Sequence, residues 1–153
     1  MEAIEITNSV EETRRLGQRI SDNLTGSENL LLVGDLGSGK TALTQGLAEG
    51  LGIVQPVKSP TYIYLQEYQL PLRSTRLAHY DLYRLPGPIS DHDLHSIDLP
   101  ERLSDRDTIT VIEWGDRMEL LLQKEYEVIR LTSLEGDRRE IRLPKKLLRA
   151  SVR

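Results

Sequence analysis

Residues 34–41 contain the residue types that proteins use to hold phosphate groups. The pattern G-x-x-x-x-G-K-[ST] is matched without a departure by Gly34-Asp35-Leu36-Gly37-Ser38-Gly39-Lys40-Thr41. Glycines let the backbone curl so that N–H groups point inward around an anion, and the helix that follows adds its positive N-terminal end. In this pattern Lys40 reaches the β- and γ-phosphates of a nucleotide, and the Thr41 hydroxyl ligates Mg²⁺. The segment therefore predicts a phosphate-binding loop rather than a glycine-rich turn with an incidental lysine.

ATP is the nucleotide that the sequence favours for this loop. The Asn-Lys-x-Asp signature of guanine-specific switch proteins is absent from the chain. The residues expected to contact bound ATP or ADP are Asp35, Leu36, Gly37, Ser38, Gly39, Lys40, Thr41 and Ala42.

Two carboxylates stand where a nucleotide site needs them. Asp81 ends the mainly apolar segment that begins at Leu77, and Glu113 directly follows the run from Ile109 to Ile112. Hydrolysis or phosphoryl transfer requires a carboxylate near Mg²⁺ and a group that positions the nucleophile. In α/β folds such groups lie at the carboxyl ends of neighbouring strands. We therefore expect Asp81 and Glu113 to face the loop, the alternative for each being a solvated strand end.

Two further positions are candidates near the nucleotide. Ser59-Pro60-Thr61 lies just past the helix expected after the loop, where a hydroxyl can sense the γ-phosphate as switch loops do. The alternative is an ordinary turn before a strand. Trp114, the only tryptophan, follows Glu113 and is expected either beside the nucleotide or a partner, or in the core.

The expected secondary structure is that of an α/β protein. Apolar alternation and β-branched runs predict strands at residues 2–7, 29–33, 61–68, 76–83, 108–112, 126–132 and 139–143. Helices are expected at residues 10–24 and 40–51, the first capped by Ser9 with Glu12 completing a capping box. Prolines punctuate residues 84–108, which predict a loop with a short helix. The fold class that follows is a P-loop NTPase-like three-layer domain, with a mostly parallel central sheet and flanking helices.

Length and composition narrow the classes of function. The chain has 153 residues, which suits a single domain, with a basic helix or tail expected at about 145–153. It has no cysteine, and its formal net charge of −4 is unfavourable for holding nucleic acid by its own field. Three scattered histidines make a histidine-built metal site unfavourable. No apolar run is long enough to span a membrane and the acidic N-terminus is unlike a signal peptide, so a cytoplasmic protein is expected.

Four blocks of the sequence, taken in order, resemble the bacterial TsaE (YjeE) family of ATPases of tRNA threonylcarbamoyladenosine biosynthesis. The blocks are residues 34–41, Ser59-Pro60-Thr61-Tyr62, His79-Tyr80-Asp81-Leu82-Tyr83-Arg84 and Ile112-Glu113-Trp114. The combination of blocks is specific, whereas the phosphate loop alone is not. The resemblance extends from about residue 5 to residue 143.

The resemblance implies a P-loop ATPase that binds and hydrolyses Mg-ATP within a complex with TsaB-like and TsaD-like proteins. That complex would transfer a threonylcarbamoyl group to the adenosine next to the anticodon of tRNAs that read codons beginning with A, so the contact with tRNA would be indirect. The resemblance implies that Thr41 and Glu113 ligate Mg²⁺ and that Asp81 orients or activates the water, or binds Mg²⁺ through water. The expected catalytic residues are Lys40, Asp81 and Thr61, with Thr61 belonging to a switch-like loop, and Arg139 would approach the nucleotide.

Two other functions remain open on the residues alone. The first is a small-molecule kinase, because a phosphate loop and a poised Asp81 suit transfer to a hydroxyl, and an arginine-bearing lid could include Arg84, Arg102 and Arg106. The second is a nucleotide-gated binding module, in which hydrolysis is slow and ATP chiefly holds a protein partner. A phosphorylated metabolite would favour the first, and partner binding that survives Asp81→Ala would favour the second.

Overall fold

The computed structural model describes residues 1–35, 37–57, 65–71, 74–82, 90–113 and 126–149. Within them lies one sheet of seven strands in the order β1-β7-β6-β2-β5-β4-β3. The strands are β1 (Glu2–Thr7), β2 (Asn29–Val33), β3 (Leu65–Gln69), β4 (Arg76–Asp81), β5 (Thr108–Glu113), β6 (Glu127–Ser133) and β7 (Arg139–Pro144). The predicted strands are therefore confirmed, although residues 61–64 and 83 of two of them lie outside the described part.

The centre of the sheet is parallel and its two flanks are antiparallel. Strands β6, β2, β5 and β4 run parallel to one another, whereas β7 pairs antiparallel with β6 and with β1, and β3 pairs antiparallel with β4. The β6–β7 pair is a hairpin closed by residues 134–138, and a connection this short allows only antiparallel strands. The expected parallel arrangement is thus found in four neighbouring strands, and β2 lies between β6 and β5.

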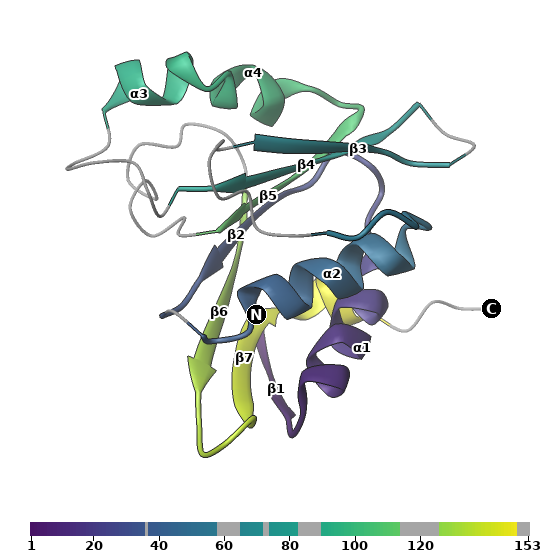
Figure 1. Cartoon of the computed structure of the whole chain (residues 1–153), viewed down its shortest axis with the longest axis vertical. Coiled ribbons are helices and arrows are strands. Elements are labelled where there is room, and N and C mark those ends of the chain that lie inside the picture. Colours follow the sequence, from purple (N-terminus) through teal and green to yellow (C-terminus); the bar gives the residue numbers. More distant parts are fainter. Residues whose placement is uncertain (36, 58–64, 72–73, 83–89, 114–125, 150–153) are drawn as a thin grey trace.

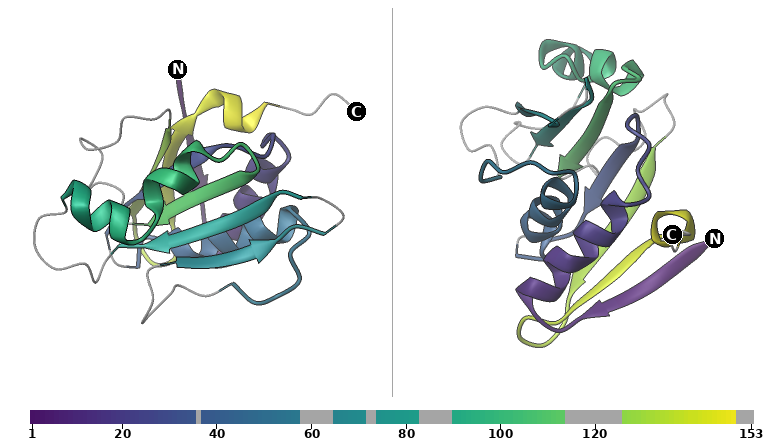
Figure 2. Two further views of the ribbon diagram at one scale, coloured as in Figure 1. Left: turned by 90° about the horizontal axis from the view of Figure 1, so that it is seen from above. Right: turned by 90° about the vertical axis from the view of Figure 1, so that its right-hand side faces the viewer.

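Helices lie on both faces of this sheet (Figures 1 and 2). Helices α1 (Val10–Ser21) and α2 (Lys40–Gly50) pack on each other and on one face. The core there includes Leu16, Ile20, Leu30, Leu32, Leu43 and Leu47. Two short helices, α3 (Asp91–Ser96) and α4 (Leu99–Ser104), cover the other face, where the core includes Leu31, Tyr80, Leu94, Leu99 and Leu103. The expected flanking helices are therefore present on both sides of the sheet.

The start of α1 differs in one bond from the predicted capping box. The Ser9 side chain accepts a hydrogen bond from the Glu12 backbone N–H at 3.1 Å, as expected. The Glu12 carboxylate, however, accepts from the backbone N–H of Asn8 at 2.6 Å, one residue before the cap. The helix ends at Ser21 rather than residue 24, because the chain turns there toward β2.

Residues of the predicted basic helix or tail form a short 3₁₀ helix, η3 (Lys145–Leu148), with Leu147 buried in the α1–α2 core. None of the helices in the described ranges is both long and apolar enough to cross a membrane.

Candidate functional site

The 34–41 loop leaves the carboxyl end of β2 and leads directly into α2 (Figure 1). Strand β2 is buried between β5 and β6, so the loop lies at the carboxyl end of a central strand and not beside an edge strand. Leu36, one of the predicted nucleotide contacts, lies outside the described residues. Asp35 and Gly37 are exposed, while Ser38 and Lys40 are buried beneath them.

The Lys40 side chain is enclosed by its own loop. Its Nζ donates to the carbonyl oxygens of Gly34 at 2.6 Å and Asp35 at 2.8 Å, and Ser38 Oγ lies 3.4 Å away. Only 5% of the lysine is exposed, so these oxygens replace the water that a buried ammonium group needs. The positive charge of Lys40 is therefore held inside the loop.

Glycine is required at several positions of the loop for distinct reasons. Gly37 and Gly39 have φ angles of 78° and 102°, which side chains rarely adopt, and Gly39 is the N-cap residue directly before α2. At Gly34 the obstacle is space: a Cβ there would lie 2.5 Å from Ser38 Oγ and 2.6 Å from the Leu131 carbonyl oxygen. The glycine spacing read from the sequence is thus needed for this backbone path.

Glu113 meets the loop at Thr41, as predicted. The Thr41 hydroxyl donates to Glu113 Oε1 at 3.4 Å, which joins the start of α2 to the end of β5. Glu113 is only 2% exposed. Asp81 occupies the matching position on the adjacent strand β4, in register with Glu113, and is half-buried. The two predicted carboxylates therefore lie side by side at the carboxyl ends of two adjacent strands.

His79 is a member of this group whose contact the sequence did not reveal. Its Nε2 lies 2.5 Å from Glu113 Oε2, and the side chain is completely buried. With its N–H on Nε2, the imidazole donates to this carboxylate oxygen. A signal was present: a polar residue stands inside an apolar strand, two positions before Asp81 and hence on the same face.

Arg139 reaches the loop from the far end of the chain. Its Nη2 donates to the Gly37 carbonyl oxygen at 2.9 Å. Its Nη1 donates to the carbonyl oxygens of Gly136 at 2.9 Å and Arg138 at 2.8 Å, so the guanidinium links the loop to the β6–β7 turn. Arg139 therefore contacts the 34–41 loop, and its approach to a nucleotide stays a prediction.

Other predicted residues fall elsewhere. Ala42, in the first turn of α2, is half-buried. The catalytic candidate Thr61, with Ser59 and Pro60, and the neighbouring Trp114 lie outside the described residues, as does Arg84 of the suggested lid.

The oxygen donors of this site suit Mg²⁺. Within the described ranges, no group of three or more His, Cys, Asp or Glu side chains is arranged to hold a metal ion. Mg²⁺ is seldom bound by an all-protein cage; it usually takes one or two protein oxygens together with nucleotide phosphates and water. The Thr41 hydroxyl and the Glu113 carboxylate, 3.4 Å apart, match that requirement.

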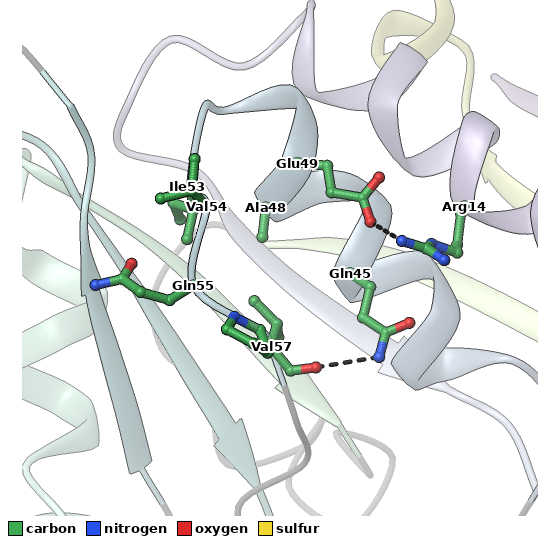
Figure 3. Close-up of a pocket in the computed structure, with 9 residues that line it drawn as sticks. Arg14, Gln45, Ala48, Glu49, Ile53, Val54, Gln55 and Val57 are labelled. Carbon is green, nitrogen blue, oxygen red and sulfur yellow. Dashed lines mark hydrogen bonds and ion pairs between the residues drawn. The ribbon is translucent and has the colours of Figure 1, made fainter.

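A separate pocket lies at the other end of α2 (Figure 3). Arg14 forms an ion pair with Glu49 there, and Gln45 Nε2 donates to the Val57 carbonyl oxygen at 3.1 Å. None of the predicted site residues lines this pocket, which separates it from the 34–41 loop.

Comparisons with known proteins point to one family. The family model described as "Threonylcarbamoyl adenosine biosynthesis protein TsaE" matches residues 7–141. A tRNA threonylcarbamoyladenosine biosynthesis protein TsaE from Streptomyces coelicolor is 36% identical over 124 residues, which cover 81% of this chain and 81% of that protein. The protein of the same description from Bacillus subtilis is 34% identical over 138 residues, covering 88% of this chain and 80% of the relative.

A solved structure shows the same similarity in three dimensions. The crystal structure of Bacillus subtilis YdiB superposes with a TM-score of 0.75 at 29% sequence identity, covering 94% of this chain and 84% of that chain. The family match and the two relatives each cover most of the sequence. The residues that the family model matches include the 34–41 loop, Asp81 and Glu113. This chain belongs to the TsaE family.

Proposed function

We propose that this protein is an ATPase that binds and hydrolyses Mg-ATP at the 34–41 loop in support of tRNA threonylcarbamoyladenosine biosynthesis. The observation that carries the proposal is the meeting of Thr41 Oγ1 with Glu113 Oε1, 3.4 Å apart. This contact places a hydroxyl and a buried carboxylate beside the loop, and both groups are suited to bind Mg²⁺. The loop also supplies a lysine of the type that binds phosphate. A loop that only bound anions would not need the carboxylate.

Each residue then has a defined task. The 34–41 loop and Lys40 hold the phosphates, with the ammonium group exchanging its carbonyl partners for phosphate oxygens. Thr41 and Glu113 ligate Mg²⁺, which when bound neutralises charge on the phosphate oxygens. Asp81 orients or activates the attacking water, and its half-buried position leaves it room to meet that water. Thr61 and Arg139 are the proposed additional contacts near the γ-phosphate and the loop.

The partners follow from the family. Relatives are described as tRNA threonylcarbamoyladenosine biosynthesis proteins, and we propose the same pathway for this chain, in a complex with TsaB-like and TsaD-like proteins. A formal net charge of −4 supports an indirect role, since affinity for tRNA rests largely on positive charge. The partner proteins would thus bind the tRNA.

Phosphate release by the purified protein tests the proposal. Wild-type protein with Mg-ATP should release free phosphate, and Lys40→Ala should not. If the γ-phosphate appears instead on a small hydroxyl compound, the protein is a kinase. If no phosphate is released with or without the partners, and Asp81→Ala supports tRNA modification as well as the wild type, the protein is a nucleotide-gated binding module.

A further inference from the structure

The pair formed by His79 and Glu113 has a feature that the proposed function does not use. His79 is completely buried on β4, and its Nε2 lies 2.5 Å from Glu113 Oε2. Its Nδ1 is also buried and has no hydrogen-bond partner among the residues that the structure describes. Placing an imidazole here leaves one of its nitrogens unsatisfied, which costs stability. An apolar residue would avoid that cost, so the bond to Glu113 needs a reason.

The direction of the bond supplies that reason. Glu113 has two carboxylate oxygens: Oε2 is held by His79, and Oε1 lies 3.4 Å from the Thr41 hydroxyl. Rotation about the last side-chain bond of a glutamate is soft, so one fixed oxygen determines where the other lies. The donor at Oε2 therefore aims Oε1 at Thr41.

We infer that His79 is a positioning residue, which holds Glu113 so that Oε1 and the Thr41 hydroxyl together receive the Mg²⁺ of Mg-ATP. This inference rests on the proposed function, because it assumes that the metal is bound at these two oxygens. Groups that hydrogen-bond to a metal ligand orient it, and their loss typically weakens metal affinity about 10–100-fold. His79 would act through Glu113, the side chain that its Nε2 contacts.

Two amide variants of His79 distinguish loss of the hydrogen bond that orients Glu113 from the cost of burying a polar side chain. In His79→Gln the side-chain amide reaches about as far as Nε2, so it can donate to Glu113. In His79→Asn the same amide stops near the position of Nδ1 and falls short of Glu113. Both variants bury the same polar group, which makes them a matched pair. His79→Leu, which has no donor at all, repeats the test if the asparagine variant fails to fold.

The readout is equilibrium binding of Mn²⁺, a paramagnetic substitute for Mg²⁺, to the protein saturated with a non-hydrolysable ATP analogue. We expect His79→Asn to bind Mn²⁺ about tenfold or more weakly than the wild type, with His79→Gln close to the wild type. Affinity for metal-free ATP should be unchanged in both. A control for general loosening is Leu77→Val, a buried residue two positions earlier on the same face. It should lower the melting temperature and leave the Mn²⁺ affinity unchanged.

The outcomes distinguish the two levels of the proposal. If His79→Asn, or His79→Leu in its place, binds the nucleotide and Mn²⁺ as tightly as the wild type, the role of His79 is overturned and the proposed function stands. Weak Mn²⁺ binding by His79→Gln as well as His79→Asn also overturns it, because the restored donor should rescue the affinity. If the wild-type protein itself binds no nucleotide, the proposed function fails and this inference fails with it.

Discussion

Asp81 and Glu113 occupy matching positions at the ends of two adjacent parallel strands, yet they differ in burial. Glu113 is 2% exposed and contacts His79 through one carboxylate oxygen and Thr41 through the other, whereas Asp81 is half-buried. A buried carboxylate whose two oxygens are both engaged is suited to hold a metal ion at a set position. One that is partly open to solvent is suited to meet a water molecule. The two carboxylates are therefore expected to respond differently to substitution.

Asp81→Asn should abolish turnover while sparing nucleotide binding. Loss of a group that orients or activates water typically lowers a rate about 10²–10⁴-fold. The affinity for Mg-ATP should remain close to that of the wild type, since the loop, Thr41 and Glu113 are intact. Phosphate release and equilibrium ATP binding, measured side by side, check both halves. Wild-type turnover in Asp81→Asn would remove this residue from the mechanism.

Lys40→Ala should eliminate both ATP binding and hydrolysis. The ammonium group is the positive charge enclosed by the loop, 2.6 Å from the Gly34 carbonyl oxygen, and nothing replaces it in the variant. Removing such a stabilising donor lowers kcat by about 10²–10³-fold even where binding survives. The matched control is Lys145→Ala, an exposed lysine of η3. An equal loss of ATP binding and hydrolysis in Lys145→Ala would mean that the total positive charge of the protein, not the lysine of the loop, determines activity.

Gly37→Ala should weaken ATP binding and stability together. With a φ angle of 78° and open space around a Cβ at this position, the penalty is one of backbone conformation, about 1–2 kcal/mol. Gly136→Ala provides the control, because Gly136 has a φ angle of 60° and equally open surroundings in the β6–β7 turn. Urea unfolding should show similar losses for both variants, and only Gly37→Ala should weaken ATP binding. Unchanged ATP affinity in Gly37→Ala would argue against a required loop geometry.

Arg139→Ala should lower ATP affinity, whereas Arg138→Ala should not. Arg139 Nη2 donates to the Gly37 carbonyl oxygen, while the neighbouring Arg138 donates to the Asn8 side chain. Both substitutions remove one positive charge from the same hairpin, so the comparison isolates the bond to the loop. Loss of a charged hydrogen bond of this kind should weaken ATP affinity about tenfold. Equal affinities for the two variants would assign Arg139 no role in the site.

Glu28→Gln should reduce stability in a pH-dependent way. Burial raises the pKa of Glu28, but hydrogen bonds from Thr25 and Gly26 outweigh it and hold the pKa below its usual value. A lowered folded-state pKa stabilises the protein above the unfolded-state pKa, and the benefit is lost as pH falls through the folded value. The variant should therefore lose about 1 kcal/mol of unfolding free energy at neutral pH, and the difference should shrink below about pH 4.

Urea unfolding at neutral and acidic pH measures this difference. Glu135→Gln, at an exposed turn position, is the control and should change the free energy of unfolding little at either pH. A constant difference between Glu28→Gln and the wild type across the pH range would contradict the assignment.

Local signals in the sequence were sufficient for most of the fold. Apolar and β-branched runs identify β2 and β5 because a strand buried on both faces has few polar residues. Glycine spacing identifies the 34–41 loop because few other residues tolerate its backbone angles. The order of strands did not follow from such signals. The pairing of β1 with β7, for example, joins opposite ends of the chain.

The parts of the site that the residues alone did not reveal are those built from distant contacts. Periodicity puts His79 on the same face as Asp81, but it says nothing of a partner on β5. The bond from Arg139 to Gly37 spans 102 positions, and only the resemblance to a family identified that arginine as a candidate. The same limit explains the Glu12 bond: the sequence spacing predicts a cap, and the fold decides which N–H the carboxylate meets.

The most direct measurement is tRNA modification in a reconstituted mixture of this protein, TsaB-like and TsaD-like partners, tRNA and ATP. Phosphate release and threonylcarbamoyladenosine formation would be followed together, with Lys40→Ala as the control. We predict weak phosphate release by the isolated protein, a rise when partners and tRNA are added, and modification that continues only with the wild type. Phosphate release that ignores the partners, or modification that proceeds equally well with Lys40→Ala, would contradict the proposed function.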